Sequence, residues 1–197
     1  ALRIDENQKV LIGDSASHTT DFLQIETPAS GGGHGIQIRR NDSNNDQQVG
    51  HVLFGNNTAT DLASLIAKTD GATDSGALLF STSPTGGSLT ERMRIDSAGL
   101  VTITRADNGQ NLRLTTTDTD ANAGPILNLF RDSSSPANND LLGNITFDGR
   151  NNAAEKVQYA EQQVFITDKA DGVEDGLVNW NVLTNGSNLS YFQLRAE

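Results

Sequence analysis

Clustered oxygen-bearing side chains in the stretch DTDANAG have a spacing that could bind a hard cation. Asp118, Asp120 and Asn122 alternate along the chain, as the first ligands of a calcium-binding loop do. The glycine that such a loop requires comes one residue late, and no glutamate occupies the twelfth position of the loop. We therefore interpret this stretch as the polar tip of a hairpin.

Histidines and catalytic motifs give no clearer site. His18, His34 and His51 lie far apart and never form an H-x-H pair, and the triple glycine at 31–33 precedes His34 rather than a helix. The sequence contains no G-x-S-x-G, no H-E-x-x-H and no phosphate-binding glycine loop. Glycan cleavage needs two nearby carboxylates, but some such pair is inevitable among 25 acidic residues. We predict no catalytic residues, no metal ligands and no cofactor.

Two arginines alternate with apolar residues in the stretch ERMRID. This alternation predicts that Arg92 and Arg94 share one face of a strand, where Glu91 and Asp96 could form ion pairs with them. Structural ion pairing is the favoured interpretation, and binding of an anionic glycan is the alternative.

Aromatic side chains could pack against the C–H faces of sugars. Trp180 and Tyr191 are the candidates for such a glycan contact, together with Tyr159. Trp180 aligns with Phe80 in an internal repeat, and Tyr159 lies in a strand pattern, so we expect both to belong to a core or an interface. Tyr191 is the freer candidate.

Composition limits the classes of partner. The formal net charge of −11 opposes binding to nucleic acid and to anionic membranes. No run of 18 apolar residues is present, so we expect no membrane insertion. The absence of cysteine excludes disulfides and thiolate chemistry. Aromatics at 5% and 19 glycines indicate a thin core and many turns.

Apolar residues recur with a period of two, which predicts half-buried strands. LQI, IQI, HVLF, MRI and VTI alternate in this way, and glycine-rich or Asn/Asp-rich stretches separate them. DSAG, with Gly99, predicts a hairpin between MRI and VTI. The corresponding DENQK lacks glycine, which leaves its turn type open. TDLASLIAK could form a helix, but its counterpart AEKVQYAEQQVFIT favours a strand, and we predict strands for both.

An internal repeat organises these strands. LRIDENQKVLIG aligns without gaps on MRIDSAGLVTIT, VGHVLFGNN on LGNITFDGRN, GALLFST on GLVNWNV, and RMRID on QLRAE. Arg40 aligns with Arg131 in the same scheme. We therefore predict an all-β fold of two homologous antiparallel modules in tandem, residues 1–104 and 105–197. The predicted repeat-core positions are Ile4, Val10, Ile12, Phe80, Met93, Ile95, Val101 and Ile103.

The repeat resembles those in the shafts and distal parts of bacteriophage tail fibres, which are common upstream of endosialidase-type intramolecular chaperone domains. The residues that carry the resemblance are Gly76, Leu78, Phe80, Thr82, Glu91, Arg92, Met93, Arg94, Ile95, Asp96, Gly99, Val101 and Ile103, and Leu2, Arg3, Ile4 and Asp5 repeat the end of the motif.

The resemblance implies an elongated, parallel homotrimer in the extracellular virion tail fibre. Its partners would be its own copies, other tail or virion proteins and host surface polysaccharide. We expect a non-catalytic structural part that contributes to host attachment, with loops 41–48 and 133–139 facing the host. A tailspike-type depolymerase and a cellular surface adhesin are the alternatives.

Overall fold

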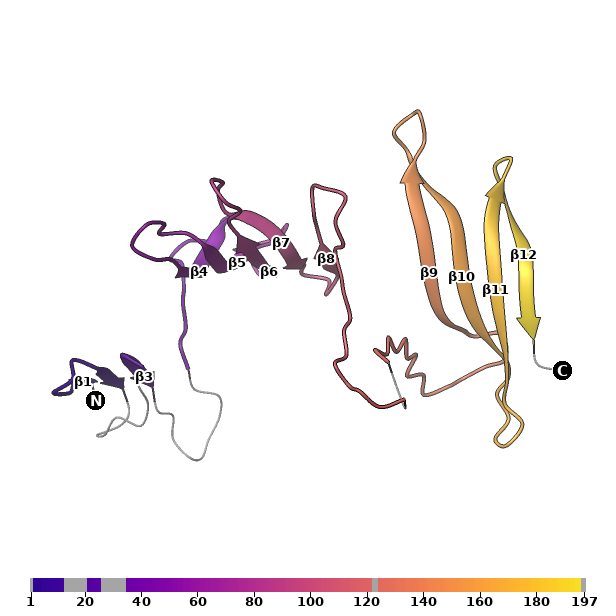
Figure 1. The fold of residues 1–197 in the computed structure, drawn as a ribbon, viewed down its shortest axis with the longest axis horizontal. Helices are drawn as coiled ribbons and strands as arrows, with labels where there is room; N and C mark the ends of the chain where they lie inside the picture. The colour runs from indigo at the N-terminus through magenta and orange to yellow at the C-terminus, as the bar shows by residue number, and fades with distance from the viewer. Residues whose placement is uncertain (1, 13–20, 26–34, 122–123, 196–197) are drawn as a thin grey trace. The chain divides into compact units, whose positions relative to one another are not determined.

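The computed structural model describes residues 2–12, 21–25, 35–121 and 124–195 of the chain. These residues form twelve β-strands and no helix, so the prediction of an all-β fold is confirmed. A helix that could cross a membrane is accordingly not found in this part of the chain. The strands belong to three sheets, which Figure 1 shows as groups of adjacent arrows.

The first sheet consists of three short strands in the order β1–β2–β3. Their bounds are β1 Leu2–Ile4, β2 Val10–Ile12 and β3 Leu23–Ile25. β1 and β2 form an antiparallel hairpin, whereas β2 and β3 pair in parallel. The parallel pair departs from the antiparallel arrangement predicted for the module. Parallel neighbours need a longer connection than a hairpin turn, and residues 13–22 connect these two strands.

The second sheet is an antiparallel meander of five strands in sequence order. Its strands are β4 Gln48–Phe54, β5 Ala63–Thr69, β6 Gly76–Thr82, β7 Thr90–Ile95 and β8 Val101–Ile103. The third sheet is an antiparallel meander of four longer strands, drawn in orange to yellow in Figure 1. Its strands are β9 Leu141–Arg150, β10 Lys156–Asp168, β11 Asp175–Thr184 and β12 Ser187–Arg195.

The ambiguous segment TDLASLIAK contains a strand, β5, and its counterpart forms β10, so the prediction of strands for both is confirmed. The predicted strand IQI is wrong, since residues 36–38 lie in no strand. Ile38 instead packs against Gly50 of β4. Arg40 donates a hydrogen bond to the carbonyl of Gln48 at 3.1 Å. This segment therefore lies against the sheet without joining it.

The hairpin turns β1–β2 and β7–β8 have the same structure. In each, an aspartate side chain accepts hydrogen bonds from the backbone N–H groups two and four residues later, all at 2.9 Å, at Asp5 and Asp96. The residue three positions after each aspartate has a positive φ, 64° at Gln8 and 86° at Gly99. The turn type left open for DENQK is thus the one that DSAG adopts, because the aspartate bonds hold the turn without glycine.

This difference predicts that two substitutions have different effects on stability. Gly99→Ala should lower the free energy of unfolding by about 1 kcal/mol, because a side chain is disfavoured at positive φ. Gln8→Gly should leave stability unchanged or raise it, because glycine adopts this conformation freely. Denaturant titration of both variants measures the difference, and equal effects would contradict the shared turn.

Bulges occur at matching places in the β4–β8 and β9–β12 meanders. Between β6 and β7 the register shift leaves Arg92 without a cross-strand partner, and between β11 and β12 it leaves Tyr191 without one. Ile95 of β7 and Leu194 of β12 each lie three residues after the bulged residue of their strand, so they are structurally equivalent. The alignment of RMRID on QLRAE, which matched Met93 with Leu194, is therefore two residues out of step. A shift of two keeps every side chain on its face, so the apolar pattern does not reveal it.

The chain divides into two compact units, Ala1–Arg113 and Leu114–Glu197. The first unit ends nine residues after the predicted end of the first module at residue 104. The first unit contains β1–β8, and the second contains β9–β12.

Candidate functional site

One face of the β4–β8 sheet is apolar. Residues that pair across antiparallel strands point to the same face, so the register defines which side chains share it. The face carries Val52, Phe54, Leu65, Leu78, Phe80, Met93, Ile95, Val101 and Ile103. Within this single chain the face remains accessible to solvent, since Phe54 is 56% and Phe80 38% exposed.

The β9–β12 sheet has a corresponding apolar face. Its members are Ile145, Phe147, Val164, Val178, Trp180, Val182, Leu189, Phe192 and Leu194. Gln162 of β10 is the polar exception in the middle of this face. Phe147 is 52% and Trp180 39% exposed. Complete burial of such a side chain contributes about 1.5 to 3 kcal/mol. These two faces are therefore the candidate assembly surfaces of the chain.

Each of the two apolar faces contains a glycine against which an apolar side chain packs. That side chain comes from the segment that precedes the sheet in the sequence. A Cβ added at Gly50 would overlap with Ile38, and one added at Gly143 would lie 3.1 Å from Cδ1 of Leu129. The pairing register shifts immediately before each glycine, in β4 and in β9. The absence of a glycine side chain therefore lets the preceding segment pack on the sheet in both units.

An arginine two residues later fixes each of these segments. Arg40 donates to the carbonyl of Gln48 at 3.1 Å, and Arg131 donates to the carbonyl of Leu141 at 3.0 Å. Both acceptors lie in the first strand of their meander. The two arginines that the repeat aligns thus make the same contact in the two units.

The predicted repeat-core positions fall into two groups. Those in β6, β7 and β8 lie on the apolar face described above, where they are partly exposed. In the first hairpin, Ile4 is 67% exposed, whereas Leu11 is fully buried. Leu11 lies on the opposite face of the hairpin from Val10 and its partner Ile4. The apolar alternation gave no signal for Leu11, because it is out of phase with the repeated positions.

The polar face of the β9–β12 sheet centres on Glu161 of β10, which is only 6% exposed. Its carboxylate accepts hydrogen bonds from Asn181 and Asn188 at 2.9 Å and from Asn144 at 3.2 Å. Burial opposes ionisation of Glu161, but these donated bonds outweigh it, so the pKa of the carboxyl lies below its usual value. Asn181 also donates to Gln163 at 3.0 Å. Side chains from all four strands thus meet at one carboxylate.

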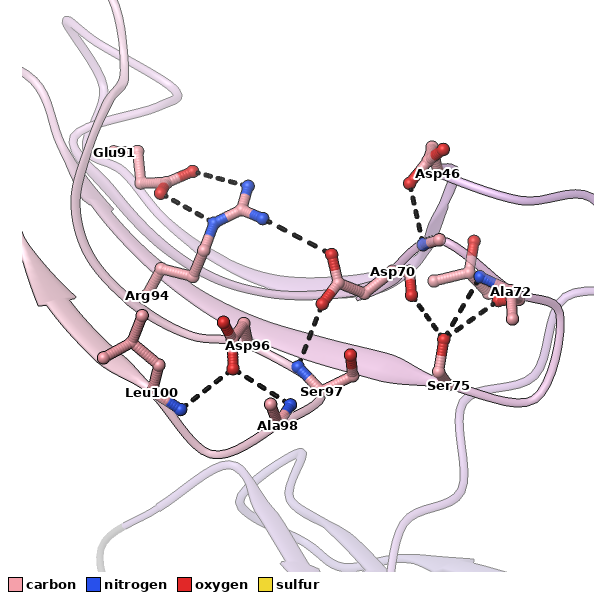
Figure 2. A network of polar contacts seen from close by, with 12 residues as sticks. Asp46, Asp70, Ala72, Ser75, Glu91, Arg94, Asp96, Ser97, Ala98 and Leu100 are labelled. Carbon is pink, nitrogen blue, oxygen red and sulfur yellow. Dashed lines mark hydrogen bonds and ion pairs between the residues drawn. The ribbon is translucent and has the colours of Figure 1, made fainter. Parts of the chain in front are cut away.

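A second polar network joins the loops at one end of the β4–β8 sheet, as Figure 2 shows. Asp70, which follows β5, accepts a hydrogen bond from the backbone N–H of Ser97 at 2.9 Å. Arg94 lies 3.7 Å from the Asp70 carboxylate and donates two bonds to Glu91, at 3.0 and 3.2 Å. Structural ion pairing is therefore observed for Arg94, with Glu91 and Asp70 as partners, while Asp96 instead accepts the backbone bonds of its turn.

This network predicts an acid-sensitive loop contact. The hydrogen bond from the Ser97 backbone, with those from its side chain and the charge of Arg94, lowers the pKa of Asp70. Because the pKa of Asp70 is lower in the folded state, its ionised carboxylate stabilises the fold at pH values above the unfolded pKa, about 3.9. This stabilisation is lost as the pH falls through the folded pKa. Hydrogen-exchange protection of the Ser97 amide should therefore fall below about pH 4, and Asp70→Asn should weaken that dependence. An unchanged protection profile in the variant would contradict this assignment.

Arg92 and Arg94 do not share a face, so that prediction is wrong. The β7 bulge puts Glu91 and Arg94 on one side of the strand. Arg92 instead donates to the hydroxyl of Thr82 at 3.1 Å and lines a groove with Ile103.

The candidate calcium ligands Asp118 and Asp120 lie in a local backbone turn. Asp118 accepts a hydrogen bond from the N–H of Asp120, and its own N–H donates to Thr116, both at 3.2 Å. Asn122 lies outside the described residues. The stretch is not a hairpin tip, since the flanking described residues from 104 to 140 contain no strand.

His51 lies in β4 and forms a hydrogen bond with Gln48. His18, His34 and the triple glycine fall outside the described residues. Among the residues that the structure describes, no group of three or more His, Cys, Asp or Glu side chains could hold a metal ion.

The two candidate glycan contacts have different surroundings. Tyr191 of β12 is 62% exposed, and its hydroxyl forms a hydrogen bond with Thr184 at 2.9 Å. Trp180 lies on the apolar face, where Phe192 of β12 is its cross-strand partner. Contact between either residue and a sugar stays a prediction.

The chain matches no protein family, no curated protein and no solved structure.

Proposed function

We propose that the chain is a structural, non-catalytic part of a bacteriophage tail fibre that contributes to host attachment. In this proposal three copies assemble in parallel and bury the apolar faces of the β4–β8 and β9–β12 sheets against one another. The protein then acts in the extracellular virion, with other virion proteins and host surface polysaccharide as partners.

The observation that carries the proposal is the exposed apolar face of each of the two meanders, β4–β8 and β9–β12. A sheet with one apolar face is stable when that face packs against another layer. Here four aromatic residues of these faces, Phe54, Phe80, Phe147 and Trp180, are still 38 to 56% exposed in one chain. Contiguous exposed apolar surface of this kind marks an interface between proteins.

A tandem repeat supports the fibre role. The β4–β7 and β9–β12 strands follow the same order, with bulges at matching places. The glycine and arginine contacts before each meander also correspond. The buried polar pair Ser64 and Ser81 likewise corresponds to Glu161 and Asn181. We infer that one module was duplicated, which is how extended repeat proteins grow.

The functional proposal is tested on the phage that encodes the chain. Antibodies raised against the purified protein are expected to label the tail fibres in electron micrographs and to reduce adsorption to host cells. Labelling of another part of the particle, or of none, would overturn the proposal. The protein should also release no new reducing ends from host polysaccharide, whereas release would favour the depolymerase.

A further inference from the structure

The β7 bulge turns Arg92 towards a groove at the end of the β4–β8 sheet. Thr82, at the end of β6, forms one wall of the groove. Thr104, Arg105, Asp107 and Gln110, in the segment after β8, form the other wall. Ile103 of β8, the edge strand of the apolar face, also lines the groove. The groove lies entirely within the first unit and adjoins the edge of the surface that the proposed trimer buries.

The guanidinium of Arg92 is only partly engaged. Its Nε donates to Thr82 at 3.1 Å, and no acceptor among the described residues bonds its two terminal nitrogens. Arg105, by contrast, pairs with Asp107 and donates to the carbonyl of Gln110 at 3.3 Å. The hydrogen bond from Arg105, followed by one from the Gly109 backbone, keeps the pKa of Asp107 low.

These contacts leave a local positive charge on an acidic protein. Asp107 pairs with Arg105 and also feels the charge of Arg92, so the two arginines and the one carboxylate leave a net charge of +1 in the groove. The two terminal nitrogens of a guanidinium match the two oxygens of a carboxylate, and the pair is stronger than a neutral hydrogen bond. The hydroxyls of Thr82 and Thr104 and the amide of Gln110 add donors and acceptors suited to the hydroxyl groups of a sugar.

We propose that this groove binds a carboxylated sugar unit, with the carboxylate on Arg92 and the ring hydroxyls along the threonine and glutamine side chains. The biological role of such a site rests on the proposed host attachment. Binding itself requires only residues 82–111 of one chain.

The corresponding bulge in the other meander supports a ligand-facing role for this position. Bulges redirect a side chain away from the regular alternation of the strand. Tyr191 at the β12 bulge is exposed, and like Arg92 it contacts a threonine hydroxyl, that of Thr184. The bulge thus carries a polar-tipped side chain in both units, half-buried at Arg92 and exposed at Tyr191. The next residues, Met93 and Phe192, belong to the apolar faces of their sheets.

The test is a titration of the full chain with methyl glucuronide, followed by ligand-observed NMR. Methyl glucoside serves as the neutral probe and inorganic phosphate as the competing anion. Arg92→Gln should weaken glucuronide binding at least about tenfold, since a bond to a charged group is lost. Arg92→Lys keeps the charge but lacks the paired nitrogens, so its affinity for the glucuronide should lie between those of the original chain and Arg92→Gln. Arg113→Gln, an exposed arginine that does not line the groove, is the matched control and should bind as the original chain does.

Each result decides the assignment. Binding of glucuronide that is lost in Arg92→Gln and kept in the control supports it. Absence of binding, equal binding of the glucoside, or equal competition by phosphate overturns it. The mass of the protein in solution tests the trimer separately, so a monomer that still binds glucuronide would reject the fibre proposal and keep this site.

Discussion

Replacing Ile95 with aspartate is expected to abolish assembly of the protein. Ile95 pairs with Leu78 and Val101 on the apolar face of the β4–β8 sheet, which the proposed trimer buries. A charge in that interface would lose its hydration in every subunit, at a cost of about 3 kcal/mol or more per subunit. Size-exclusion chromatography with light scattering should therefore report dissociated or aggregated chains for Ile95→Asp.

The matched control places the same charge on the opposite face. Thr102 of β8 is exposed and pairs with Arg94 on the face opposite Ile95. Thr102→Asp should therefore assemble as the original chain does. Normal assembly of Ile95→Asp, or equal disruption by both substitutions, would show that the apolar face is not the interface.

Replacing Glu161 with alanine is expected to destabilise the β9–β12 sheet by about 3 kcal/mol or more. The change removes the shared acceptor of Asn144, Asn181 and Asn188, and each hydrogen bond to a charged group contributes about 1.5 to 3 kcal/mol. Asn181, the buried donor of the three, keeps only its bond to Gln163. Trp180 is the only tryptophan of the chain and lies in β11. Its fluorescence therefore reports unfolding of this sheet directly.

Two comparisons make the Glu161 prediction specific. Glu174→Ala removes an exposed carboxylate that accepts one hydrogen bond, from Gly172 at 3.1 Å, and should cost less than about 1 kcal/mol. The lowered pKa of Glu161 also has a consequence for pH. The ionised Glu161 stabilises the folded sheet fully at pH values above the unfolded pKa, about 4.3. This stabilisation is lost as the pH falls through the folded pKa. Equal stability of the Glu161 and Glu174 variants would contradict the network.

The alternation of apolar residues carried most of the fold prediction. It located β4, β7 and β8, because side chains on a half-buried strand repeat every two residues. The strands β5 and β10 were predicted from the internal repeat, which implies one structure for both. The same period predicted the apolar face that contains Phe80, Met93 and Ile95. It could not detect the two-residue misalignment at the end of β12, because a shift of two leaves the pattern unchanged.

The errors arise where backbone hydrogen bonding or long-range contacts override local pattern. Residues 36–38 alternate like a strand, yet Ile38 packs on Gly50 instead of pairing. The β7 bulge separated Arg92 from Arg94, and strict alternation could not anticipate it. Glu161 gave no signal in the sequence, because its partners come from strands distant along the chain. A buried polar side chain such as Glu161 can be recognised only when the pairing register of the neighbouring strands is known.

Sedimentation equilibrium of the purified chain at micromolar concentration tests the proposed assembly most directly. Burial of the two apolar faces between three copies predicts a mass of three times 21.0 kDa, about 63 kDa. A single folded species of 21.0 kDa would mean that these faces need no partner, and it would contradict the fibre proposal.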